Sequence, residues 1–154
     1  MVSWPFHRRK REEPQYEPHT YIQEYWNTMS NVFFVYLGLL GLVDAHTEEG
    51  RILYGFMMLC GCCSALHHAI SWKYSIAIDY APIIGSVVYF STLDKWHDIS
   101  VGSWIALATG ALTLGWDHHK QPRTDPFGHS LWHIMAALAA RSVCFDVDNA
   151  CRLN

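Results

Sequence analysis

The sequence predicts an all-α fold, a polytopic membrane helix bundle with about five transmembrane helices. Hydrophobic residues make up 51% of the 154 residues and charged residues only 16%, well under the roughly 25% charged residues of an ordinary soluble protein. The apolar residues also gather in five segments of roughly 17–20 residues, about the length that a helix needs to cross the hydrocarbon core. These segments run approximately over residues 25–43, 52–70, 76–93, 99–116 and 129–145.

Short polar connections separate the five segments and indicate where each predicted helix ends. The first three connections read DAHTEEGR, SWKYS and DKWHD. The fourth is DHHKQPRTDPFG, whose proline and glycine residues are typical of a true loop. A soluble bundle of buried helices is the alternative, but five such segments leave few amphipathic faces to meet water. The expected organisation is therefore a polar N-terminal tail over residues 1–24, a membrane bundle over 25–145 and a C-terminal tail over 146–154.

Charge and cysteine content exclude several classes of function. The net charge of −3 argues against a nucleic-acid partner. The basic residues 7–11 are followed at once by Glu12 and Glu13, so we interpret them as a solvated tail, with a lipid-headgroup or topology signal as the alternative. The balance of Lys and Arg weakly places the N-terminus in the cytoplasm. The five cysteines form no CxxC pair, and burial in the core explains them better than a disulfide framework.

Five polar residues within or beside the apolar segments are the candidate functional residues: Ser64, His68, Asp79, His129 and His133. Ionisable groups inside a membrane are costly to bury and are functional candidates by default. Because successive helices cross the membrane in opposite directions, the end of the second, the start of the third and the start of the fifth lie on the same side. We therefore expect all five residues to lie at one depth, near one face of the membrane.

Histidine spacing predicts a metal site. His129 and His133 are four residues apart and project from one face of a helix, a spacing that places two histidines on one metal in helical zinc hydrolases. A third imidazole completes a three-histidine zinc site with an open position for water. Asp79 would act as general acid and base, and Ser64 would donate a hydrogen bond to the substrate carbonyl. Two alternatives stay open. The HxxxH pair also has the spacing of an ordinary helix contact. His67 could replace His68 as the third ligand, and only the i, i+4 register with Ser64 favours His68.

The segment EYWNTMSN at residues 24–31 resembles the signature that opens the first membrane helix of alkaline ceramidases. The pattern continues with a Ser and a His four residues later, an Asp eleven residues after that, and a late HxxxH. Here these are Ser64, His68, Asp79, His129 and His133. The wider superfamily includes the adiponectin-type receptors and has seven membrane helices, so this chain resembles a shortened version of that fold.

The resemblance implies a function and a set of roles. It implies that the three histidines hold Zn²⁺, and that Asp79 and Ser64 assist the hydrolysis of the N-acyl bond of a ceramide to a sphingoid base and a fatty acid. It also implies a possible Ca²⁺ site at Glu13, Gln15 and Glu24, although Lys10 and Gln15 depart from the family's Asp and Asn. Glu24 is equally explained as a helix N-terminal charge.

The expected partners are a ceramide-like lipid and the bilayer itself, and the resemblance implies the endoplasmic reticulum or Golgi for a eukaryotic protein. Two alternative functions remain: a related membrane hydrolase acting on another lipid amide or ester, and a non-catalytic, receptor-like protein with structural zinc. Asn27, Ser30 and Asn31 are expected to have structural roles, packing polar groups between helices.

Overall fold

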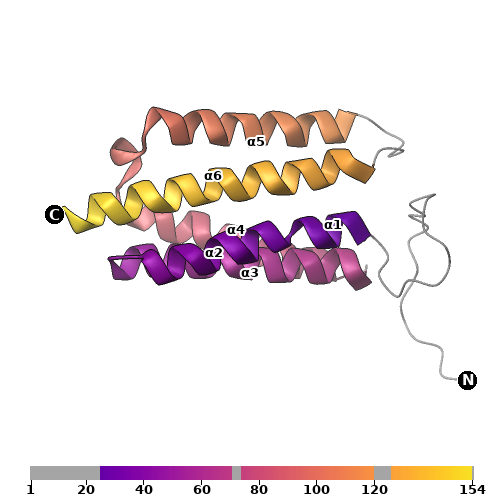
Figure 1. Cartoon of the computed structure of the whole chain (residues 1–154), viewed down its shortest axis with the longest axis horizontal. Helices are drawn as coiled ribbons and strands as arrows, with labels where there is room; N and C mark the ends of the chain where they lie inside the picture. The colour runs from indigo at the N-terminus through magenta and orange to yellow at the C-terminus, as the bar shows by residue number, and fades with distance from the viewer. Residues whose placement is uncertain (1–24, 71–73, 120–125, 154) are drawn as a thin grey trace, which may run out of the picture.

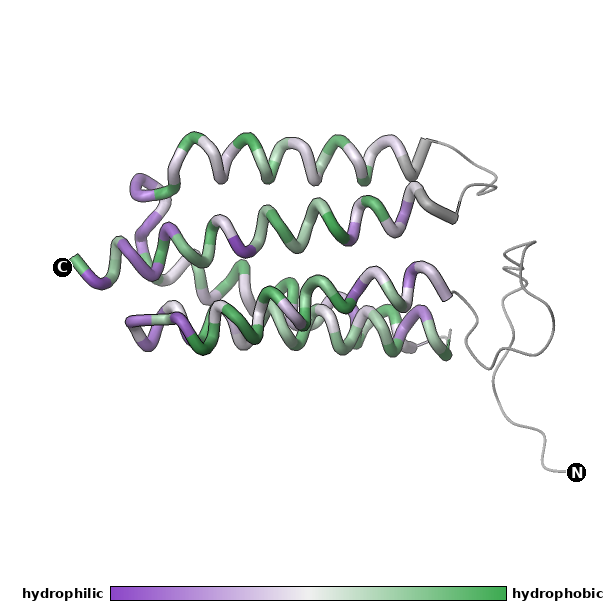
Figure 2. Tube along the Cα trace, in the orientation of Figure 1, coloured by the Kyte–Doolittle hydropathy of each residue, from purple (hydrophilic) through white to green (hydrophobic). Residues whose placement is uncertain are grey.

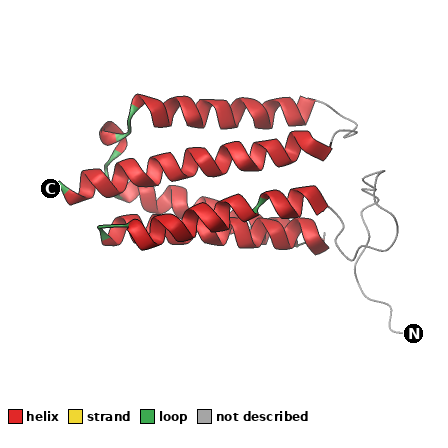
Figure 3. Ribbon diagram, in the orientation of Figure 1, coloured by secondary structure: helices red, strands yellow, loops and turns green. Residues whose placement is uncertain are grey.

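The computed structural model describes residues 25–70, 74–119 and 126–153, and all regular structure in them is helical (Figure 3). In chain order the elements are α1 (Tyr25–Ser30), α2 (Val32–Asp44), α3 (Glu48–Ile70), α4 (Ser75–Thr92), the short 3-10 helix η1 (Trp96–Asp98), α5 (Val101–His119) and α6 (Pro126–Arg152). Helices α1 and α2 lie nearly end to end (Figure 1), so the described residues form five long rods. The predicted all-α helix bundle is confirmed.

Helix α6 is the central rod of the bundle. It packs against α1, α2, α3 and α5, whereas α4 packs mainly on α3 and α5 mainly on α6 (Figure 1). The core between the rods is built by Leu53, Tyr54 and Met57 of α3 together with Ala137 and Val147 of α6. All five side chains are at most 5% exposed.

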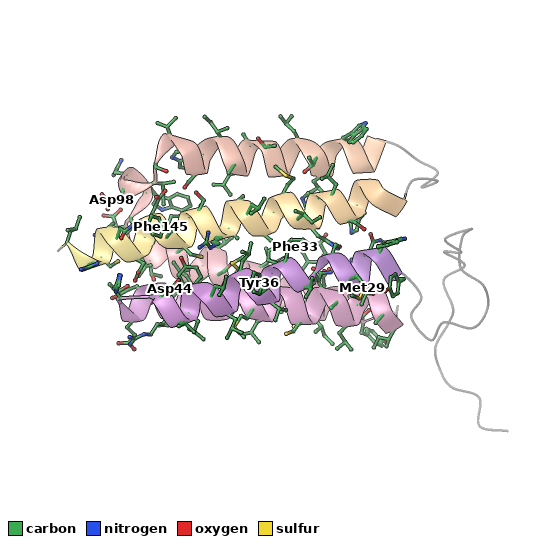
Figure 4. The ribbon with its side chains drawn as sticks, in the orientation of Figure 1. Met29, Phe33, Tyr36, Asp44, Asp98 and Phe145 are labelled. Carbon is green, nitrogen blue, oxygen red and sulfur yellow. The ribbon has the colours of Figure 1, made fainter. Side chains whose placement is uncertain are left out.

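The outer faces of the rods are apolar, as expected for helices that contact lipid. Met29, Phe33 and Tyr36 follow one another along α1 and α2 (Figure 4) and are 43%, 40% and 56% exposed. Figure 2 shows hydrophobic residues along the middle of the rods and many of the hydrophilic ones near their ends. Because a soluble monomer rarely exposes so much contiguous apolar surface, the bundle is a membrane protein.

Three of the five predicted spans are long and apolar enough to cross a membrane: Tyr25–Asp44, Glu48–Ile70 and Ser75–Thr92. Among the other described residues, Val101–Trp116 is a shorter apolar helix, and α6 does not reach the same apolarity. Helix α6 carries His129, His133, Arg141, Asp146 and Asp148. A central helix tolerates such residues because most of its surface contacts other helices rather than lipid.

The first rod is interrupted at Asn31, where one continuous helix was expected. The carbonyl of Asn27 accepts hydrogen bonds from the Asn31 Nδ2 at 2.8 Å and from the Ser30 Oγ at 3.0 Å. The Asn31 backbone N–H bonds instead to the carbonyl of Thr28 at 3.3 Å, one residue short of the α-helical partner. The side chains therefore compete with the helical ladder and break it.

Gly61 of α3 lets the two helices meet at this break. A Cβ atom at Gly61 would lie 2.7 Å from the Cβ of Phe34, 2.8 Å from the Cγ2 of Val35 and 3.0 Å from the carbonyl oxygen of Asn31. A side chain here would push α3 away from the break. Ser64 lies three residues further along α3, so this approach also brings its helix turn against the first rod.

Helix α6 continues to Arg152, through residues that were expected to form a C-terminal tail from 146. Asp146 and Asp148 explain the extension, because both carboxylates bond to neighbouring helix starts. Asp146 Oδ2 accepts from the Ser103 Oγ at 2.6 Å and from the Ser100 N–H at 2.9 Å. These bonds hold α5, which packs mainly on α6, at its N-terminal end.

Asp148 caps the start of α3. Its carboxylate accepts hydrogen bonds from the backbone N–H of His46 at 3.0 Å, and from the N–H and Oγ1 of Thr47 at 2.9 and 2.6 Å. Thr47 Oγ1 in turn accepts from the Gly50 N–H at 3.0 Å, as an N-cap residue does. Burial would raise the pKa of Asp148, but the hydrogen bonds from Thr47 and His46 outweigh it and hold the pKa below its ordinary value of 3.8.

We expect Asp148→Ala to lower the free energy of unfolding by about 1–3 kcal/mol at pH 7, because the partly buried N–H groups of His46 and Thr47 lose their acceptor. The pKa of Asp148 is lower in the folded than in the unfolded protein. The stability that its carboxylate contributes is therefore fully present above pH 3.8 and is lost as the pH falls through the pKa of the folded state. Denaturant titrations of the detergent-solubilised protein at several pH values measure both effects. Asp44→Ala, at an exposed position, is the control, and equal midpoints for Asp148→Ala and wild type at pH 7 would contradict the cap.

Candidate metal centre

Three histidines from two helices meet at one end of the bundle. His68 lies in the last turn of α3, and His129 and His133 lie one turn apart near the start of α6. Their ring nitrogens offer one set of ligand atoms that all lie within 4.8 Å of one another. His68 is 4% exposed, His133 is 1% exposed, and His129 is half-buried. The helix ends that carry them lie at the end of the bundle where α1 begins (Figure 1).

The histidine set fits a zinc ion in both chemistry and spacing. Imidazole nitrogens bind Zn²⁺ at about 2.0–2.1 Å, so two ligands of one ion are at most about 4 Å apart. The observed nitrogen set, within 4.8 Å, is close to that spacing. The distances between ring centroids are 5.1 Å for His68–His129, 5.0 Å for His68–His133 and 4.6 Å for His129–His133, so the three rings form one cluster. Among the described residues this is the one such group of three or more His, Cys, Asp or Glu side chains.

The structure distinguishes His68 from His67. His68 takes part in the three-histidine group, whereas the His67 Nδ1 lies 2.6 Å from the Oγ of Ser75 at the start of α4. Ser75 is 1% exposed. His67 therefore contacts the start of α4, although its ring centroid lies 5.1 Å from that of His68.

Ser64 lies on α3, which carries His68, and Asp79 lies on α4, which packs on α3. Ser64 is buried one turn before His68 on α3, and Asp79 is half-buried one turn into α4. Helix α4 packs on α3, and the Asp79 carboxylate is within electrostatic reach of Cys60 and Cys63 on α3. No hydrogen bond or ion pair with another described residue occupies it.

Helix α1 contributes contacts to the centre that the sequence did not assign. Ser30 Oγ lies 2.8 Å from the Nδ1 of His133, and Ser130 Oγ donates to the Asn27 Oδ1 at 3.0 Å. Asn27, Ser30 and Asn31 were expected to pack between helices, which they do, but the bond to His133 was missed. The available signal was the polar stripe at spacings of three and four residues in an otherwise apolar segment, which predicts a polar partner within the bundle.

The predicted calcium ligands lie outside the described residues. Glu13, Gln15 and Glu24 all precede residue 25, where the structural description begins. Calcium binding therefore stays a prediction from the sequence.

The fold and the site define a helical membrane protein with a three-histidine metal-binding geometry at one end of its bundle. The family model described as Ceramidase matches residues 12–122, more than half of the chain. The chain therefore belongs to the ceramidase family. No curated protein and no solved structure matches the chain.

The family match and the histidine geometry cover different residues of the candidate metal centre. The matched residues include Ser64, His68 and Asp79 but end before His129 and His133. The two histidines of α6 are assigned to the centre by their distance from His68.

Proposed function

We propose that the protein is a zinc-dependent membrane amidase that hydrolyses the N-acyl bond of ceramides to a sphingoid base and a fatty acid. The observation that carries the proposal is the group of His68, His129 and His133, placed at one end of a membrane bundle that belongs to the ceramidase family. Three imidazoles leave one tetrahedral position open, which is the arrangement of catalytic rather than structural zinc. The zinc ion would supply Lewis acidity and lower the pKa of a bound water from 15.7 to about 7.

The neighbouring polar residues complete the proposed reaction. Asp79 accepts a proton from the attacking water, whose oxygen bonds to the carbonyl carbon, and then returns the proton to the nitrogen as the C–N bond breaks. Ser64 donates a hydrogen bond to the carbonyl oxygen while negative charge develops there. Ser64 lies on α3, one turn before His68, and Asp79 lies one turn into α4, which packs on α3.

The membrane setting supports a lipid substrate. Exposed apolar side chains cover the outer faces of α4 and α5, including Ile84, Val88, Ile105 and Leu112. A substrate dissolved in the bilayer would reach the centre laterally, with its amide at the depth of the histidines. In a eukaryotic cell we place the protein in the endoplasmic reticulum or Golgi, as the family resemblance implies.

The test is hydrolysis of a ceramide panel by the detergent-purified protein, before and after metal removal with a chelator and after zinc is added back. We expect sphingoid base to be released by the zinc-loaded protein, lost on chelation and restored by zinc. Turnover of another lipid amide or ester, with no ceramide cleaved, would overturn the substrate assignment. Zinc that raises the melting temperature without turnover of any lipid would overturn the enzymatic role.

A further inference from the structure

Ser30 is a buried hydroxyl from one helix that contacts a histidine of another. It ends α1, is 6% exposed, and its Oγ lies 2.8 Å from the Nδ1 of His133 on α6. The two residues are 103 positions apart in the chain. Local helix formation does not explain the contact, which depends on the packing of α1 against α6.

The direction of this hydrogen bond follows from the second bond that Ser30 makes. The Ser30 Oγ donates its proton to the carbonyl of Asn27 at 3.0 Å. A hydroxyl has a single proton and two acceptor lone pairs, so a Ser30 hydroxyl that donates to Asn27 can only accept from His133, and we assign the imidazole Nδ1–H as the donor. In a neutral imidazole this places the proton on Nδ1 and leaves the Nε2 lone pair to act as a metal ligand.

A second polar bond joins the same two helices. Asn27 Oδ1 accepts from the Ser130 Oγ at 3.0 Å, again with a separation of 103 residues. The Asn27–Ser130 and Ser30–His133 pairs are thus neighbouring rungs between α1 and α6, one helix turn apart. The Asn27 carbonyl, held also by Asn31 Nδ2 at 2.8 Å, orients the Ser30 hydroxyl.

We propose that Ser30 is a positioning residue for the metal centre, which fixes the tautomer and ring orientation of His133 so that its Nε2 faces the nitrogens of His68 and His129. The proposal rests on the three-histidine zinc site of the proposed function. Metal-binding histidines commonly donate their other ring N–H to an oxygen, and loss of that partner typically weakens metal binding 10–100-fold. Ser30 supplies this oxygen from a separate helix.

The experiment measures the zinc Kd of the full-length protein by competition with a chromophoric chelator at fixed pH. We expect Ser30→Ala to raise the Kd about 10–100-fold, and Ser30→Thr, which retains the hydroxyl, to bind zinc nearly as tightly as wild type. Ser130→Ala is the matched control, because it removes the neighbouring α1–α6 rung and leaves the oxygen at His133 in place. The visible spectrum of the cobalt-loaded protein should change in Ser30→Ala and stay as in wild type in Ser130→Ala.

Each outcome separates this inference from the proposed function. A wild-type protein that binds no zinc overturns the zinc site itself. Wild-type zinc affinity in Ser30→Ala, or an equal loss in Ser130→Ala, overturns the positioning role and leaves the zinc site standing. The melting temperatures of the zinc-free proteins show whether a variant is folded. If Ser30→Ala is not folded, Ser30→Cys is measured in its place. This near-isosteric change introduces a weak hydrogen-bond acceptor, and the same loss of zinc affinity is expected.

Discussion

His129→Ala is expected to lose its zinc and all measurable ceramide hydrolysis. Removal of one imidazole leaves two ligands, and the effect on zinc affinity should exceed the 10–100-fold typical of losing a residue that merely orients a ligand. His129 is the most informative of the three positions because it is only half-buried. Substitution of His133, which is 1% exposed and bonded to Ser30, would change helix packing as well as the set of metal ligands.

The measurements are zinc per protein by elemental analysis and the rate of sphingoid-base release, for wild type and variant purified in the same detergent. His97→Ala, at an exposed position in η1, is the matched control and should keep full zinc content and activity. Zinc content and turnover equal to wild type in His129→Ala would rule out the three-histidine assignment.

Asp79→Asn is expected to keep its zinc and to lower kcat by about 10²–10⁴-fold, the usual contribution of a positioned general acid or base. Asparagine has nearly the same shape as aspartate, so the α3–α4 packing should be preserved. It cannot take the proton of the attacking water or return it to the leaving nitrogen. Because Asp79 bonds to no other described residue, the substitution also breaks no ion pair in the described part of the chain.

Separate determination of kcat, KM and zinc content distinguishes the proposed acid-base role from a binding role. A large fall in kcat with unchanged zinc content is the expected result, and Asp44→Asn, at the exposed end of α2, should match wild type. Unchanged kcat in Asp79→Asn would remove Asp79 from the reaction. Loss of zinc in the same variant would instead make Asp79 part of the metal site.

The number and the approximate positions of the helices were predictable, because the length of an apolar segment is a local property of the sequence. Each of the five apolar segments corresponds to a rod, and the shared depth of His68, His129 and His133 followed from the alternating direction of the helices. Boundaries were less predictable. The break at Asn31 arises from side-chain hydrogen bonds to the Asn27 carbonyl, and the extension of α6 beyond residue 145 is accompanied by carboxylate contacts with the starts of α3 and α5.

The sequence by itself determined the class of protein and the candidate metal ligands, because membrane-length apolar segments and histidines at helical spacing are encoded within single helices. Only the tertiary structure decided which groups touch. It separated His68 from His67 through the contact with Ser75, and it placed Ser30 of α1 against His133 of α6. The Ser30–His133 contact joins residues 103 positions apart. Both contacts depend on how two helices pack, which no spacing along one helix encodes.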